Sequence, residues 1–170
     1  YKKEKNEGKG SAVIFGYKKV SSSHIIVHDA DLEYNPRDIL KMVEISKISP
    51  NSLILGSRFK GNLTRKNLYK RTYYANKLMS SLFSFIHNFK ISDIATCYKL
   101  MPSKFFKNLN FNEKGFSIEV EILAKFLKYN KSILEVPISY QGRSYEEGKK
   151  IKSIDGIRYI LKTFKYKFLG

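Results

Sequence analysis

The stretch that decides the fold is "HIIVHDADLEYNPRDIL", residues 24–40, where an apolar segment runs directly into acidic residues. Residues 22–29 are short and rich in β-branched side chains, which predicts a buried strand. The Asn-Pro pair at 35–36 suits the N-cap and first position of a helix, so we predict a helix over residues 35–46. The acidic residues therefore lie where a strand ends and before a helix begins.

Three carboxylates, Asp29, Asp31 and Glu33, stand at this junction in a chain with 32 Lys and Arg against 15 Asp and Glu. Two aspartates one residue apart at a strand end can bind one hard cation, with the glutamate as a third oxygen ligand. The alternative is that they are helix N-terminal charges, which the helix dipole favours. An EF-hand is excluded, because Tyr34 and Leu40 occupy its required Gly and Glu positions.

Outward from this stretch, strand-like segments alternate with helix-like ones. The other expected strands are residues 52–59, 96–101 and 132–140, and the other expected helices are residues 10–20, 65–88, 103–109, 117–130 and 152–168. Such alternation predicts an α/β layered sheet, in which ligand sites lie beyond the carboxyl ends of the strands. No repeat or low-complexity linker divides the chain, so we expect residues 1–170 to form a single domain.

The net charge of +17 favours polyanions, phosphates or an anionic membrane surface as partners. The alternative is a lysine-rich composition spread over a solvated surface. A single cysteine, Cys97, rules out an internal disulfide and suits a reducing compartment. No apolar run approaches the length of about 20 residues that a bilayer-spanning helix needs. We therefore expect a protein of the cytosol or of the cytosolic face of a membrane.

Basic residues follow two further strands. Arg58 ends one of them, and Arg143, Lys149 and Lys150 lie in a glycine-containing loop after another. Together they suit an anion clamp for phosphates, although each alone is also consistent with ordinary surface charge. The segment "GKG" at residues 8–10 is not a Walker A loop, but it leaves open a looser phosphate-contacting turn.

The last expected helix carries apolar residues at helical spacing with lysines between them. Its apolar residues are Ile154, Ile157, Leu161, Phe164 and Phe168. We expect this stripe to pack onto the sheet. The alternative is an interfacial helix that lies on a membrane surface.

Six segments together resemble glycosyltransferase family 2, in particular its dolichol-phosphate mannose synthase and polyprenyl-phosphate subgroup. The resemblance extends over nearly the whole chain in order and spacing. The segments are "GKGSAV" (8–13), "HDADLEYNP" (28–36), "GSRF" (56–59), "SDIATCYKL" (92–100), "GFSIEVEILAK" (115–125) and "EVPISYQGRSYEEGKKI" (135–151).

The resemblance implies a GT-A fold, a three-layer α/β/α arrangement. Family members begin with a strand and a "YNE"-like turn, so we expect this chain to lack the first strands and to be inactive alone. In the family an Asp-x-Asp motif, here Asp29 and Asp31, holds a divalent cation, Mg²⁺ or Mn²⁺, on the donor diphosphate. Glu33 then completes the metal site.

The implied reaction is inverting transfer of a hexose, mannose or glucose, from GDP-hexose or UDP-hexose to dolichyl or polyprenyl phosphate at the cytosolic membrane surface. The implied catalytic residues are Asp93, Arg58 and Arg143, and the implied substrate contacts are Lys9, Asp29, Arg58, Arg143, Lys149 and Lys150. Asp93 matches the family's general base for hydroxyl acceptors, whereas a lipid phosphate needs positioning rather than a base. One alternative keeps the family but takes a hydroxyl of a glycan or cell-surface polymer as the acceptor. A distant alternative is a basic nucleic-acid-binding module. On the main interpretation we expect no nucleic acid partner.

Overall fold

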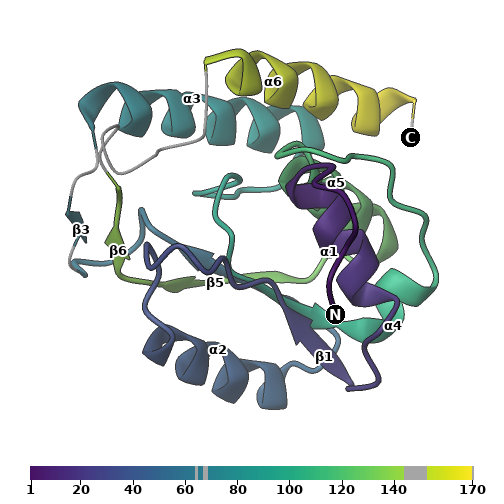
Figure 1. The fold of residues 1–170 in the computed structure, drawn as a ribbon. Helices are drawn as coiled ribbons and strands as arrows, with labels where there is room; N and C mark the ends of the chain where they lie inside the picture. The colour runs from purple at the N-terminus through teal and green to yellow at the C-terminus, as the bar shows by residue number, and fades with distance from the viewer. Residues whose placement is uncertain (64, 67–68, 144–152, 170) are drawn as a thin grey trace.

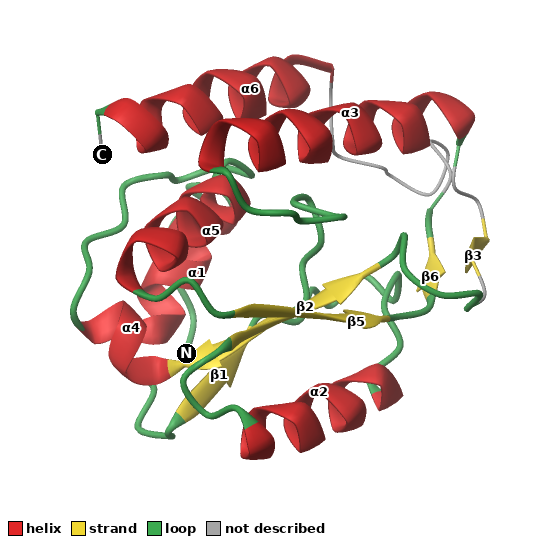
Figure 2. Cartoon of the chain, turned by 180° about the vertical axis from the view of Figure 1, so that it is seen from behind, coloured by secondary structure: helices red, strands yellow, loops and turns green. Residues whose placement is uncertain are grey.

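A four-stranded mixed sheet runs through the middle of the molecule, with helices on both faces (Figures 1 and 2). The computed structural model describes every residue except 64, 67–68, 144–152 and 170. The strands are β1 His24–Ile26, β2 Leu53–Ser57, β3 Arg65–Lys66, β4 Lys99–Pro102, β5 Ile133–Pro137 and β6 Tyr140–Gln141. The helices are α1 Lys9–Tyr17, α2 Arg37–Ile48, α3 Lys70–His87, α4 Ser103–Lys107, α5 Ile118–Tyr129 and α6 Ser153–Phe168.

The strand order in the main sheet is β1-β4-β2-β5. Strand β4 pairs antiparallel with both β1 and β2, and β5 pairs parallel with β2. Strands β1, β2 and β5 therefore run in the same direction, and the segments that leave them emerge at the same edge of the sheet. This topology brings the acidic segment after β1 close to the residues that follow β2.

Strand β2 shows how the core is divided. All of its residues are buried, as expected for a strand covered on both faces. Leu53 and Leu55 belong to the apolar cluster under α5, whereas Ile54 between them belongs to the cluster under α2. This alternation has the period of two that a strand imposes. The α/β layered architecture expected from the sequence is confirmed.

Every expected element is present, with one correction and small shifts at the ends. The helix expected over residues 65–88 begins only at Lys70, because Arg65 and Lys66 form β3 and pair parallel with β6. Backbone pairing with a segment distant in sequence has here overridden the local helical pattern. The second helix begins at Arg37, whose N–H donates to Asn35 Oδ1 at 3.1 Å.

Helix α6 contradicts the expectation that its apolar stripe packs onto the sheet. The five side chains of that stripe are 44% to 70% exposed, and the inward face instead carries Tyr159, Thr163 and Tyr166. Helices α3 and α6 lie side by side in the outermost layer, on the side of the sheet opposite α2 (Figure 1). Within the described ranges no helix combines the length and the apolar character that crossing a bilayer requires.

Candidate functional site

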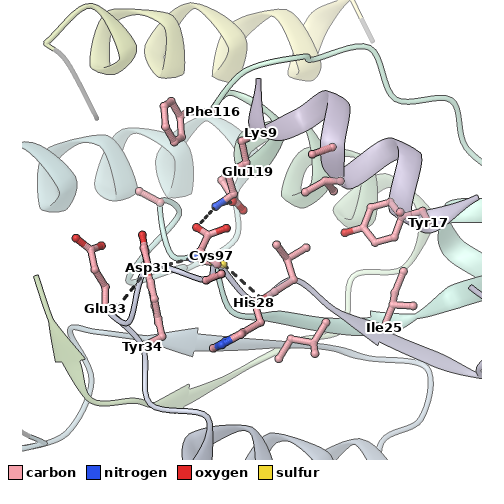
Figure 3. A pocket seen from close by; sticks show the side chains of 18 of the residues that line it. Lys9, Tyr17, Ile25, His28, Asp31, Glu33, Tyr34, Cys97, Phe116 and Glu119 are labelled. Atoms are coloured by element: carbon pink, nitrogen blue, oxygen red, sulfur yellow. Dashed lines mark hydrogen bonds and ion pairs between the residues drawn. The ribbon is translucent and has the colours of Figure 1, made fainter. Parts of the chain in front are cut away.

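A cleft of about 1090 Å³ opens between α1 and the end of β1 (Figure 3). Its wall includes α1, β1 with the acidic segment after it, and single residues from the ends of β2 and β6 and from α5. The predicted site residues on this wall are Lys9, Asp29, Asp31, Glu33, Arg58 and Arg143. The sequence prediction that several strand ends converge is therefore realised in one cleft. The predicted contacts Lys149 and Lys150 lie outside the described residues.

Arg143 joins two of the three carboxylates. Its Nη2 donates to Asp31 Oδ2 at 3.0 Å, and its backbone N–H donates to Glu33 Oε1 at 3.0 Å. Tyr140 Oη donates to the other oxygen of Glu33 at 3.0 Å. The guanidinium of Arg143 thus pairs with Asp31 and, through Nε at 3.4 Å, with Glu33, while Asp29 pairs with Lys9.

The three carboxylates do not converge on one point. Among the described residues, no group of three or more His, Cys, Asp or Glu side chains is arranged to hold a metal ion. A cation on a diphosphate needs less, because Mg²⁺ commonly takes one or two protein carboxylates and completes its shell with phosphate oxygens and water. Asp29 and Asp31 offer hard oxygen donors, partly exposed, in the cleft. Their chemistry fits such a cation.

The two glycines of "GKG" allow the start of α1 to pack closely against residues 113–115. A Cβ on Gly10 would lie 1.9 Å from the carbonyl oxygen of Glu113, and Gly8 adopts a φ of 98° beside Lys114. The Ser11 N–H donates to the Lys114 carbonyl at 3.0 Å. The start of α1 can therefore approach residues 113–115 only without side chains at these positions. This close approach directs the intervening lysine into the cleft.

Lys9 lies in a chain of alternating charges. Its Nζ is 2.7 Å from Asp29 Oδ2 and 2.7 Å from Glu119 Oε1, and Glu119 Oε2 is 2.5 Å from Lys99 Nζ. In Figure 3, Lys9 and Glu119 lie together on one side of the cleft. Burial alone would lower the pKa of Lys9, but the charges of Glu119 and Asp29 raise that pKa well above its ordinary value. Lys9 is therefore a firmly charged ammonium on the cleft wall.

Arg58 and Asp93 form a second buried ion pair. Arg58 donates from Nε and Nη2 to the two oxygens of Asp93, both at 2.8 Å, and its backbone N–H adds a bond at 3.1 Å. Asp93 is fully buried and does not line the cleft. The Arg58 guanidinium also lies over the Tyr140 ring, 5.0 Å from its centroid. The structure thus places Asp93 behind Arg58 and brings only Arg58 to the cleft.

Sequence reasoning missed three residues of this region. Glu119 and Lys99 are buried charges within apolar segments, "SIEVEIL" and "CYKLM", and a charge inside such a run was the available signal. The third, Tyr34, accepts the Cys97 N–H at 3.2 Å under the acidic segment. Cys97 itself is no nucleophile, because burial raises the pKa of its thiol to about 12.

Comparison with curated proteins gives relatives of the same kind. The chain is 30% identical over 169 residues to the dolichol-phosphate mannosyltransferase of Pyrococcus furiosus, which covers 97% of this chain and 47% of that protein. It is 26% identical over 145 residues to a glycosyltransferase of Haloferax volcanii, which covers 82% of this chain and 46% of that protein. The chain thus spans about half the length of these relatives.

Among solved structures, the chain resembles glucosyl-3-phosphoglycerate synthase from Mycobacterium tuberculosis. The complex with Mn²⁺, uridine diphosphate and phosphoglyceric acid gives a TM-score of 0.69 at 13% identity, covering 94% of this chain and 54% of that one. At this identity the likeness shows the fold, which is of the GT-A type. The family model for glycosyl transferase family 2 matches residues 1–109. The chain therefore belongs to glycosyltransferase family 2.

Proposed function

We propose that the protein containing this chain is an inverting glycosyltransferase that moves a hexose from GDP-hexose or UDP-hexose to dolichyl or polyprenyl phosphate. The observation that carries the proposal is the composition of one cleft wall. Asp29 and Asp31 offer carboxylates there, and Lys9 and Arg143 offer cations within 3.0 Å of them. Both halves of a site for a cation-bound diphosphate are thus present.

On this proposal Asp29 and Asp31 hold the divalent cation, Mg²⁺ or Mn²⁺, whereas Glu33, the predicted third ligand, is bound by Tyr140 and Arg143 and does not converge with them. When bound, the cation neutralises the leaving nucleoside diphosphate. A solved structure of similar fold contains Mn²⁺ together with uridine diphosphate. The residues of this chain bind and orient the donor, and the acceptor attacks from the opposite face of the sugar, which inverts the anomeric centre.

Lys9 and Arg143 are proposed to contact the donor phosphates. Both are cations on the cleft wall, and both are paired there with carboxylates of the acidic segment. Arg58 differs, because its charge is balanced by Asp93 and its side chain is buried. We assign it to shaping the cleft beneath the reacting groups. Lys149 and Lys150 stay predicted phosphate contacts.

The surroundings of Asp93 favour a phosphate acceptor over a hydroxyl. A hydroxyl acceptor needs a base within hydrogen-bond reach, whereas a lipid phosphate is already ionised near neutral pH. Asp93 is held by Arg58 and has no surface on the cleft. The relative from Pyrococcus furiosus is a dolichol-phosphate mannosyltransferase, which agrees with a lipid phosphate acceptor.

The outer face of α3 and α6 supports a membrane location. We call it the outer apolar face, and it comprises Tyr74, Leu78, Phe85, Ile154, Ile157, Leu161, Phe164 and Phe168, all exposed. Lys165 and Lys167 lie in the last turn of α6. Exposed apolar side chains flanked by lysines suit insertion into an anionic lipid surface. A lipid-linked acceptor would be found at that surface.

Hexose transfer tests the proposal directly. Full-length protein is incubated with radiolabelled GDP-mannose, UDP-glucose or another common donor, with polyprenyl phosphate and Mg²⁺ or Mn²⁺. We expect an organic-extractable lipid-linked sugar whose formation stops on chelation of the cation. No lipid-linked sugar from any donor would overturn the proposal, and transfer only to glycan hydroxyls would replace the acceptor.

A further inference from the structure

We propose that Glu119 is a positioning residue for donor binding, and that it acts through Lys9. On this view Glu119 fixes the Lys9 ammonium at the place on the cleft wall where it meets the donor diphosphate. The inference rests on the proposed function, since it presumes a diphosphate in the cleft. Glu119 itself is not required to touch the donor.

The two partners of Lys9 differ in how firmly they are held. The Asp29 side chain is 31% exposed, whereas that of Glu119 is 2% exposed. Glu119 is fixed from behind by Lys99, which is fully buried and donates in addition to the backbone carbonyl of Thr96. Glu119 is thus the immobile partner, and Asp29 is the partner that faces the solvent of the cleft.

The order of charges keeps Lys9 available to an anion. Lys99 balances the charge of Glu119, so Glu119 can hold the Lys9 ammonium without cancelling its attraction for a phosphate. A buried carboxylate with no second cation would take the whole charge of Lys9. The fully buried Lys99 therefore has a role beyond packing, because it leaves the Lys9 ammonium available to a phosphate.

The backbone brings Lys9 and Glu119 together with little freedom. Gly10 allows α1 to approach the segment that leads into α5, and Glu119 lies in the first turn of α5. A free lysine side chain pays rotamer entropy when a ligand immobilises it, and a lysine already held does not. Loss of Glu119 should therefore weaken donor binding through Lys9.

Calorimetric titration of GDP and UDP in the presence of Mg²⁺ tests this with the full-length protein. For the nucleotide that the wild type binds, Glu119→Gln should raise Kd up to about tenfold, the value expected for one immobilised side chain. Lys9→Met should raise it at least as much. The variant with both changes should bind no more weakly than Lys9→Met alone, because residues that act as one unit are not additive.

Glu121→Gln is the matched control. Glu121 is also a fully buried carboxylate in the first turn of α5, but it accepts the N–H groups of Asn112 and Glu113 and pairs with Lys125 at 2.7 Å. It does not line the cleft. We expect this variant to lower Tm and to leave the nucleotide Kd unchanged.

If Glu119→Gln fails to fold, it can be combined with Lys99→Met. This double variant removes both charges of the buried pair, so that no ammonium at position 99 is left without a carboxylate partner. It should show the same loss of affinity. The inference is overturned if the Kd of either variant is unchanged or lower, or if the effects of Glu119→Gln and Lys9→Met are additive. In that case nucleotide binding by the wild type would still leave the proposed function standing. A wild type that binds neither nucleotide overturns both.

Discussion

The cleft wall and the outer apolar face both depart from the usual rule that charged side chains are exposed and apolar ones are buried, but each breaks a different half of it. In the cleft, the charged groups of Glu119 and Arg58 are buried and paired, and Lys9 is partly buried and paired. On the outer face of α3 and α6, large apolar groups such as Leu161 and Phe168 are exposed. Large apolar side chains are also exposed elsewhere, for example Leu40 and Ile48 on α2, but more of them lie on α3 and α6 than on α2. On our proposal, this difference reflects two partners: an ionic ligand at the cleft wall and a lipid surface at the outer apolar face.

Both departures have a free-energy cost that folding alone does not explain. Buried ion pairs contribute little net stability, since desolvation offsets their attraction. Each Å² of apolar surface that stays in water forgoes about 25 cal/mol of the stabilisation that burial would give. Features that cost stability and cluster in space are more informative about function than the core is.

The largest expected effect lies in the cleft. Asp31→Asn should lower kcat/KM for hexose transfer about a thousandfold, because it removes a carboxylate ligand of the cation that neutralises the leaving diphosphate. Initial rates with radiolabelled donor measure it. The control is Asp38→Asn, which removes a carboxylate that accepts the N–H and Oγ–H of Ser139 outside the cleft. Equal losses of activity in the two variants would remove the distinction between cleft carboxylates and structural ones.

Next comes the buried pair beneath the cleft. Asp93→Asn leaves the Arg58 charge buried without its partner and should lower the free energy of unfolding by about 3–5 kcal/mol. Urea denaturation measures it, and adding Arg58→Met should restore much of the loss. A cost below about 1 kcal/mol would show that water reaches the guanidinium.

The same variant separates the two acceptor classes. With a lipid phosphate acceptor, Asp93→Asn should keep appreciable activity per folded molecule, because no proton has to be removed. With a hydroxyl acceptor it should abolish turnover. The activity is measured by transfer assays at a temperature where circular dichroism shows that the variant stays folded.

The outer face is tested by lipid binding. Leu161→Glu with Phe164→Glu should lower co-sedimentation with anionic vesicles at least about tenfold, because two exposed apolar contacts are lost and two negative charges added. The control is Leu40→Glu, which changes a 67% exposed leucine on α2, on the opposite side of the sheet. Equal vesicle binding by both variants would show that the outer apolar face does not contact lipid.

The smallest effect concerns His87 at the α3–α6 contact. Burial, followed by the charges of Lys167 and Lys128, lowers the pKa of His87 from 6.5 to about 4, although its bond to the Thr163 carbonyl opposes this. Between these values the unfolded chain binds a proton that the folded chain does not, so stability falls as the pH is lowered. For a half-buried group we expect about 1 kcal/mol lost from pH 7 to pH 5. Thermal unfolding should show a smaller loss in His87→Asn, and an equal loss would assign the effect elsewhere.

The sequence predicted the sheet, its flanking helices and most of the charged residues on the cleft wall, because apolar periodicity and the acidic junction are local patterns. It misplaced the start of α3, since the β3–β6 pairing depends on a partner about 75 residues away. The sequence predicted that the apolar stripe of α6 packs onto the sheet, whereas the stripe is exposed. The two cases have the same sequence pattern, because an apolar stripe suits either a sheet or a lipid surface. Glu119 and Lys99 were missed because they pair between α5 and β4, and Glu119 meets Lys9 only through the close approach of α1.

The short β3–β6 ladder joins the two regions mechanically. Strand β6 leads to Arg143 and contacts the acidic segment, because the Gln141 N–H donates to the Glu33 carbonyl. Strand β3 precedes α3 in the chain. A displacement of Arg143 from Asp31 would therefore act on the same ladder that precedes α3 in the chain. The ladder is thus the structural link between the cleft wall and the helix layer that carries the outer apolar face.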